Sequence, residues 1–187
     1  MEAGKGGQGQ IDPTLAWGPD GSPVLIWKTD GNADKKPTPI RYAKLTPNGL
    51  GFAVGPSWAT TQLITDTLAW EHGIVEAPWV VPHGGQFFLF YSGAQFKNGY
   101  AVGVARATAL EGPYTKKGPP ILAGDSFEAP GHCSVIQVAD GNWAIVYHAW
   151  RGADRTQRHM MLDTLSWGPD GWPFVNGNVP STAGNTP

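Results

Sequence analysis

The stretch that decides the fold is residues 75–91, VEAPWVVPHGGQFFLFY. It opens with a carboxylate, continues through apolar residues to a Gly-Gly pair, and ends in a strongly aromatic segment. Glycine pairs suit tight hairpin turns because such turns require positive φ angles, and aromatic residues are enriched in strands. The stretch therefore predicts a β-hairpin whose second strand covers residues 87–91.

The same pattern occurs twice more, as IDPTLAWGPDGSPVLIW at residues 11–27 and GHCSVIQVADGNWAIVYHAW at 131–150. Each copy opens with an ionisable residue (Asp12, Glu76 or His132), and a turn glycine follows nine residues later. The spacing between copies is 64 and 56 residues, so each repeat has room for three or four short strands. Further strands are predicted at residues 24–27, 40–45, 100–105, 143–147 and 160–167.

Regular hairpins of this kind build a β-propeller, a sandwich or a barrel. The propeller is favoured because the first strand of each blade lines a central channel, where Asp12, Glu76 and His132 would converge. We therefore expect an all-β chain with about three four-stranded blades starting near residues 11, 74 and 130. Residues 1–10, which are rich in glycine, are expected to form a flexible leader, and residues 11–187 a partial propeller domain.

Composition supports this class of fold. Hydrophobic residues make up 41% of the chain and nine residues are Trp, which argues against disorder, while 26 Gly and 17 Pro argue against long helices. A net charge of −2 without long basic runs argues against binding to nucleic acid or to an anionic membrane. A single cysteine excludes an internal disulfide, and no signal peptide is visible.

Asp12, Glu76 and His132 form the leading candidate site, because cleavage of a glycosidic bond uses paired carboxylic groups. The alternative is that Asp12 only starts a turn before Pro13 and that Glu76 is solvated; the shared register favours a site. Arg158 opens an apolar strand. Its side chain either points at the axis of the propeller or is an exposed charge on an edge strand. Trp17 and Phe127 either stack on sugar rings or pack between blades.

Several segments together resemble glycoside hydrolase family 43. They are IDPTLAW, VEAPWVV with FFLFYSG, YAVGVARA with GPY, PGHCSV with VYHAW, and RHMMLDTLSWGPDGWP. They occur in the family's order and cover residues 11–173. The resemblance implies the last three blades of a five-bladed propeller, and an inverting arabinofuranosidase, arabinanase or β-xylosidase activity on plant polysaccharides.

The resemblance also implies roles for single residues. Glu76 corresponds to the general acid, and Asp12 to the acid that tunes the pKa of the general acid, since a neighbouring carboxylate favours the protonated form. His132 corresponds to an axial histidine that in some members lies near a bound calcium ion, which makes it the candidate metal ligand. Arg158 corresponds to an arginine that contacts the substrate. No cofactor is required beyond that possible calcium.

The sequence departs from the family in one respect. The family's general base is an Asp on a blade upstream of the IDP motif, whereas this chain begins eleven residues before Asp12. We expect the base and two blades to come from a second copy of the chain or from a complementary N-terminal chain, unless the sequence is a truncation. The alternatives to an enzyme are a non-catalytic carbohydrate-binding or assembly module and a scaffold for protein partners. An extracellular location is expected from the family.

Overall fold

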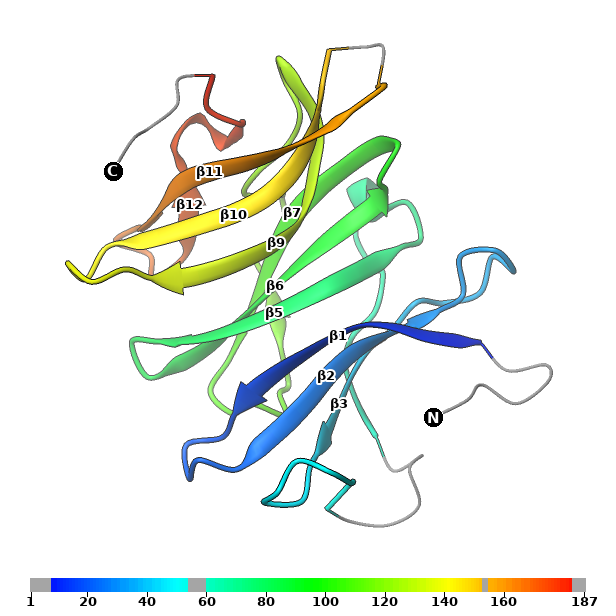
Figure 1. Cartoon of the computed structure of the whole chain (residues 1–187), viewed down its shortest axis with the longest axis vertical. Coiled ribbons are helices and arrows are strands. Elements are labelled where there is room, and N and C mark those ends of the chain that lie inside the picture. The colour runs from blue at the N-terminus through cyan, green and yellow to red at the C-terminus, as the bar shows by residue number, and fades with distance from the viewer. Residues whose placement is uncertain (1–7, 54–59, 153–154, 183–187) are drawn as a thin grey trace.

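The computed structural model describes residues 8–53, 60–152 and 155–182, with the side chain of residue 176 excepted. In these segments the chain forms three four-stranded antiparallel sheets that follow one another along the long axis of the molecule (Figure 1). The first sheet contains β1 (Gly9–Trp17), β2 (Pro23–Asp30), β3 (Ile40–Lys44) and β4 (Thr61–Ile64). A short hairpin connects β1 to β2, as the Asp-Gly turn at residues 20–21 predicts, and a longer loop at residues 31–39 connects β2 to β3.

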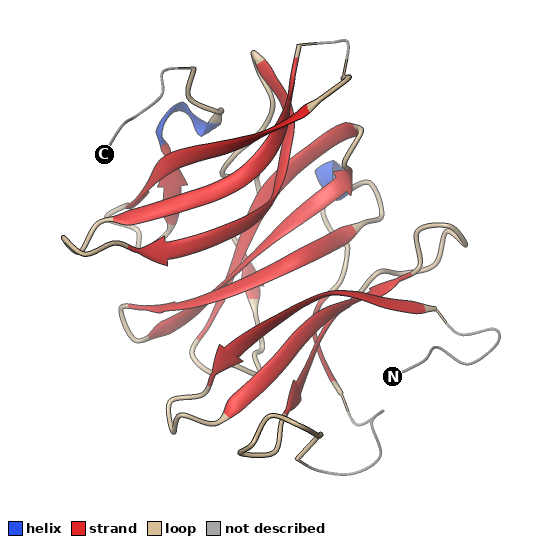
Figure 2. Cartoon of the chain, viewed as in Figure 1, coloured by secondary structure: helices blue, strands red, loops and turns tan. Residues whose placement is uncertain are grey.

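The second and third sheets repeat this meander. The second contains β5 (Val75–His83), β6 (Gln86–Gln95), β7 (Asn98–Ala107) and β8 (Thr115–Lys116). The third contains β9 (Phe127–Gln137), β10 (Trp143–Arg151), β11 (Arg158–Trp167) and β12 (Pro173–Val175). The helical residues in the described segments belong to two single turns, η1 (Ala69–Glu71) and η2 (Asn176–Asn178) (Figure 2).

The all-β class and the three four-stranded blades predicted from the sequence are confirmed. The predicted strands lie within β2, β6, β7, β10 and β11, and the one predicted at 40–45 matches β3 except that β3 ends one residue earlier, at Lys44. Residues 1–7 of the expected flexible leader lie outside the described residues. From Gly9 onward the chain already pairs with β2, because Gly9 lies opposite Asp30 and the Gln10 side chain accepts a hydrogen bond from the Trp27 indole at 2.6 Å.

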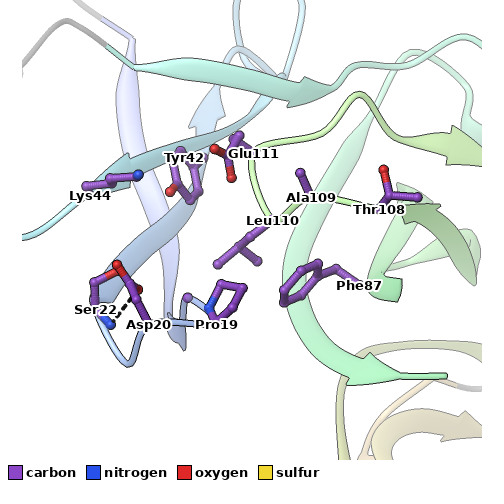
Figure 3. A pocket seen from close by; sticks show the side chains of 11 residues that line it. Pro19, Asp20, Ser22, Tyr42, Lys44, Phe87, Thr108, Ala109, Leu110 and Glu111 are labelled. Carbon is purple, nitrogen blue, oxygen red and sulfur yellow. Dashed lines mark hydrogen bonds between the residues drawn. The ribbon is translucent and has the colours of Figure 1, made fainter. Parts of the chain in front are cut away.

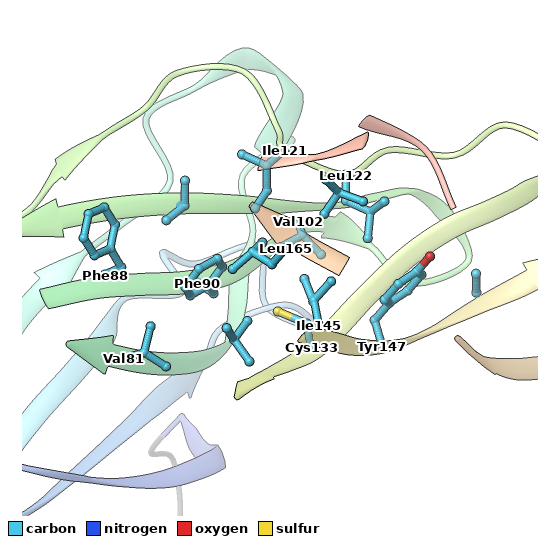
Figure 4. Close-up of a cluster of buried hydrophobic side chains, with 14 residues drawn as sticks. Val81, Phe88, Phe90, Val102, Ile121, Leu122, Cys133, Ile145, Tyr147 and Leu165 are labelled. Atoms are coloured by element: carbon cyan, nitrogen blue, oxygen red, sulfur yellow. The ribbon is translucent and has the colours of Figure 1, made fainter. Parts of the chain in front are cut away.

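Apolar side chains fill the two spaces between successive blades. The cluster between the first two blades includes Ile26, Tyr42, Leu89 and Tyr91. A larger cluster lies between the second and third blades, where Phe90 and Val102 face Cys133 and Ile145 (Figure 4). The middle blade is therefore covered on both faces, and each flanking blade on one.

The outward faces of the two flanking blades keep apolar side chains in solvent. In β1 these are Leu15 and Trp17, which are 52% and 61% exposed. In β11 they are Met160 and Leu162, which are 84% and 44% exposed and alternate with more buried residues. Apolar faces of this kind are unusual on a free surface and mark contact surfaces.

Candidate active site

The first strand of each blade carries a β-bulge at the same place in its ladder. The bulges lie opposite Trp27 in the first blade, Tyr91 in the second and Tyr147 in the third. A bulge places two residues opposite one, bends the strand and re-aims its side chains. The first bulge residue has positive φ in all three blades: Asp12 at 53°, Ala77 at 52° and His132 at 54°.

This register differs from the one predicted by counting from the turn glycines. Asp12 and His132 occupy the same bulge position, but in the second blade that position is held by Ala77, and Glu76 precedes it by one residue. The reason is the length of the turn. The second hairpin joins His83 to Gln86 with two residues between them, whereas the first joins Trp17 to Pro23 with five, so a glycine does not mark the same ladder position in both.

Both carboxylate oxygens of Glu76 are held by donors from two blades. The Lys28 ammonium donates to Oε2 at 2.6 Å, and the Tyr100 hydroxyl donates to Oε1 at 2.7 Å. The Asn32 amide lies 3.5 Å from Oε2. The Lys28 side chain is fully buried and that of Glu76 is 13% exposed, so this is a buried ion pair with an additional hydroxyl donor.

Tyr100 is a stable donor in this arrangement. Burial first, and the charge of Glu76 second, raise the pKa of Tyr100 well above its ordinary value of 10.0. The hydroxyl therefore stays protonated and can keep donating to the carboxylate. Gly131 of the third blade makes room for this ring, since a Cβ at Gly131 would clash with its edge.

Asp12 connects the first blade to the backbone beside Glu76. Its Oδ2 accepts a hydrogen bond from the Ala77 N–H at 3.0 Å. Ala77 follows Glu76 directly and has a positive φ, so the bond stabilises a backbone conformation that is uncommon for a residue other than glycine. Asp12 thus helps to fix the backbone conformation next to Glu76, and with it the orientation of the Glu76 side chain.

The third blade contributes His132 and His148. The His132 N–H donates to the Ser92 hydroxyl at 2.8 Å, and its ring centroid lies 6.3 Å from that of His148. The His148 ring stacks on Tyr100 with centroids 6.0 Å apart and planes 15° apart. Through these contacts the third blade reaches the hydroxyl that holds Glu76.

Arg158 lies beside His148, with Nη1 3.3 Å from Nε2 of the imidazole. Burial lowers the pKa of His148 from 6.5 to about 4, and the neighbouring charges of Arg158 and His132 act in the same direction. The imidazole is therefore neutral near neutral pH and can accept from the guanidinium. Its Nδ1 is buried without a hydrogen-bond partner among the described residues.

The structure thus brings Asp12, Glu76, His132 and Arg158 into one chain of contacts, while the two predicted aromatic residues lie elsewhere. Trp17 is at the far end of β1, five residues or roughly 16 Å along the strand from Asp12. Phe127 packs against the core between the second and third blades, with its ring 6.3 Å from that of His159.

The described residues do not assemble a complete metal site. In these segments no group of three His, Cys, Asp or Glu side chains is placed to hold an ion. The ring next to His132 is the imidazole of His148, whereas calcium takes six to eight oxygen ligands. The calcium ion implied by the resemblance therefore does not fit the residues that this part of the chain supplies.

Three other ionisable groups are accounted for by structural contacts or by burial. Glu71 is fully buried and pairs with Lys116 at 2.5 Å. Asp163 accepts a hydrogen bond from the Tyr147 hydroxyl at 2.5 Å. The Cys133 thiol is buried, as its alternation with His132 predicts, and burial raises its pKa to about 12.

Three partners in the site were not found from the sequence: Lys28, Tyr100 and His148. Lys28 could have been suspected, because it is a charged residue directly after the apolar run PVLIW. A buried lysine requires a partner. Tyr100 and His148 gave no such signal, since tyrosine and histidine are ordinary residues in half-buried strands.

A separate pocket lies at the other end of the strands, beside the β1–β2 turn. It has a volume of about 350 Å³, with Pro19, Tyr42, Leu110 and Phe87 forming its apolar part and Lys44 and Glu111 near its rim (Figure 3). None of the predicted site residues lines it.

A partial propeller with carboxylates on the first strands of adjacent blades places the chain among the β-propeller glycoside hydrolases. More specifically, residues 1–173 match the family described as Glycosyl hydrolases family 43, and the chain belongs to this family. It is 30% identical over 182 residues to an extracellular exo-α-(1→5)-L-arabinofuranosidase of Streptomyces avermitilis, a match that covers 87% of this chain and 36% of the relative.

Solved structures show the same fold. A thermostable family-43 glycoside hydrolase superposes with a TM-score of 0.81 at 25% identity, over 93% of this chain and 60% of the other. An endo-1,4-β-xylanase from Bacteroides thetaiotaomicron superposes with a TM-score of 0.79 at 25% identity, over 90% and 58%. The chain thus spans about 60% of these structures and about a third of the curated relative.

Proposed function

We propose that this chain is the acid-bearing part of an inverting glycoside hydrolase that cleaves arabinose- or xylose-containing plant polysaccharides. The observation that carries the proposal is the fixed position of Glu76: its carboxylate lies at a strand start, is 13% exposed, and has both oxygens held, by Lys28 and by Tyr100. A catalytic acid must present its carboxyl group in one orientation to the leaving oxygen. The family membership and the names of the relatives support the substrate class.

In this proposal Glu76 takes up a proton from solvent and transfers it to the oxygen of the departing sugar. One of its two contacts, with the Lys28 ammonium or with the Tyr100 hydroxyl, opens to make room for that proton. Asp12 fixes the backbone that follows Glu76 and adds negative charge near it. His132 and Arg158 form the side of the pocket that binds sugar hydroxyls. A carboxylate on the opposite side of the sugar ring activates water, as inversion requires; we assign it to another polypeptide segment.

The acid assignment is tested by Glu76→Gln, with Glu111→Gln as a matched control at an exposed carboxylate distant from the site. Both variants are assayed on aryl α-L-arabinofuranosides and aryl β-D-xylosides and on the corresponding oligosaccharides. We expect Glu76→Gln to lower turnover of the oligosaccharides by a factor of at least 10², within the range of general acid catalysis, and Glu111→Gln to leave it unchanged. A Glu76→Gln variant as active as the original chain would disprove the assignment.

The exposed apolar faces of β1 and β11 favour completion of the propeller by a further polypeptide. A second copy of this chain or a complementary N-terminal chain would cover Leu15 and Trp17 on one side and Met160 and Leu162 on the other. Light scattering of the purified chain, with hydrolysis assayed on the same fractions, tests this part. A defined oligomer that turns over substrate supports it, and an active monomer contradicts it.

The same exposed faces support a second candidate, a non-catalytic assembly or carbohydrate-binding module. Arabinose or xylose oligomers would then raise the melting temperature without any product, in every oligomeric state. A protein scaffold would show no response to any of these sugars.

The proposed location is extracellular, since the Streptomyces relative is named as an extracellular enzyme. Among the described residues there is no helix with the length and apolarity needed to cross a membrane.

A further inference from the structure

Two neighbouring hollows lie near Glu76 and share two lining residues, and we refer to them together as the trough. The inner hollow, of about 470 Å³, lies between the β2–β3 loop, which contributes Asn32 and Lys36, and the segment before β5, which contributes Asp66 and His72. The outer hollow, of about 310 Å³, reaches the β6–β7 turn at Asn98. Both are lined by His72 and Gln95, so they lie side by side.

Asn32 connects this trough to the proposed acid. Its side chain lines the inner hollow, and its Nδ2 lies 3.5 Å from Oε2 of Glu76. The carbonyl end of the same side chain accepts a hydrogen bond from Lys28 at 3.1 Å. The trough therefore begins one side chain away from the carboxyl group that would protonate the leaving oxygen.

The segment that carries His72 is fixed by hydrogen bonds to a buried carboxylate. Both backbone N–H groups at residues 67 and 68 donate to the buried carboxylate of Glu71, at 2.7 and 2.8 Å. The Tyr91 hydroxyl and the Lys116 ammonium occupy its other oxygen. His72 itself is in the left-handed conformation, with φ of 47°, which turns the chain toward β5. A preformed wall lowers the entropic cost of binding a ligand.

The lining combines polar side chains with apolar surface from Pro37 and Ile74, and among the described residues it contains no Phe, Tyr or Trp. Amide, imidazole, ammonium and carboxylate groups surround the trough, and each volume lies in the range of small-molecule sites, about 300–1,000 Å³. Such a surface recognises hydroxyl groups by hydrogen bonding rather than by stacking. A hydrated, uncharged sugar chain matches it.

We propose that this trough binds the leaving-group part of the substrate, two or more pentose units of an oligosaccharide, with His72 and Gln95 contacting the junction between the units. The inference rests on the proposed function, because the leaving group must lie on the side of Glu76. Discrimination between a short and a long leaving group would then reside in these two residues rather than at the propeller axis.

The test uses the isotope-labelled full chain carrying Glu76→Gln, with amide NMR shifts followed during titration with α-1,5-arabinotriose and with β-1,4-xylotriose. Arabinose and xylose themselves serve as short probes. We expect one trisaccharide to shift the amides of Gly73, Gln95 and Asn98 as well as those of Ala77 and His132. The monosaccharides should shift only the axial pair.

Substitution then assigns the contacts. His72→Ala and Gln95→Ala should each weaken trisaccharide binding by roughly 2- to 10-fold, the value of one hydrogen bond, and leave monosaccharide binding unchanged. Gln86→Ala, at the opposite end of β6, is the matched control and should change neither. Trisaccharide shifts confined to Ala77 and His132 would overturn the trough and leave the proposed function standing. No shift with any sugar would overturn both.

Discussion

Removal of the Lys28 ammonium should destabilise the chain far more than removal of an exposed lysine. In Lys28→Met the side chain keeps a similar length, so little cavity forms, but Glu76 loses its 2.6 Å ion-pair partner. Breaking a buried ion pair from one side costs about 3–5 kcal/mol. Tyr100 still donates to Glu76 and the carboxylate is 13% exposed, so we expect the lower end, about 3 kcal/mol.

The assay is thermal and urea unfolding at pH 7, followed by tryptophan fluorescence. For a chain of this length a loss of 3 kcal/mol lowers the melting temperature by roughly 6–12 °C. Lys36→Met is the matched control, because Lys36 pairs with Asp34 at 3.3 Å while both side chains are more than half exposed. Exposed pairs of this kind contribute about 0.5 kcal/mol or less.

A double variant separates the ion pair from general packing. Glu76→Gln alone leaves the buried Lys28 ammonium with a weaker acceptor, so it is also destabilising. If the two charges interact directly, Lys28→Met combined with Glu76→Gln should be less destabilised than the sum of the single variants, by more than about 1 kcal/mol. Strict additivity, or equal losses in Lys28→Met and Lys36→Met, would refute the reasoning.

Three further outcomes follow from the same contacts. Burial depresses the pKa of His148 from 6.5 to about 4, so on acidification the unfolded chain takes up a proton before the folded chain does. Stability should therefore fall as pH drops from 6.5 to 4, by ~1–2 kcal/mol for a part-exposed ring. Unfolding measured at several pH values should show a shallower dependence of stability on pH in His148→Gln, and an equal dependence would contradict this. The Cys133 thiol, with a pKa of about 12, should not react with a thiol reagent at pH 8 until the chain is unfolded, and fast labelling of the native chain would disprove its burial. Gly131→Ala should cost about 1–3 kcal/mol in urea unfolding, because its Cβ would meet the Tyr100 ring, whereas Gly141→Ala, where nothing lies within 4 Å but φ is 85°, should show only the backbone cost.

The blades could be predicted from the sequence because their determinants are local. Asp-Gly and Gly-Gly pairs fix the hairpins, and aromatic or branched residues after them form the strands. The exact register could not be predicted by counting, because one hairpin has a two-residue turn and another has five. Counting still selected Glu76, because it directly precedes the bulge residue Ala77, and its role as the acid stays a proposal.

The contacts around Glu76 could not be predicted for a different reason: they come from strands of three different blades. Lys28 belongs to the first blade, Tyr100 to the second, and the His148 ring that stacks on Tyr100 to the third. A repeat pattern aligns equivalent positions of the blades, but it does not show which non-equivalent residues of neighbouring blades are in contact. The orientation of Glu76 therefore depends on both inter-blade cores, and substitutions within those cores should alter the site as well as the stability of the chain.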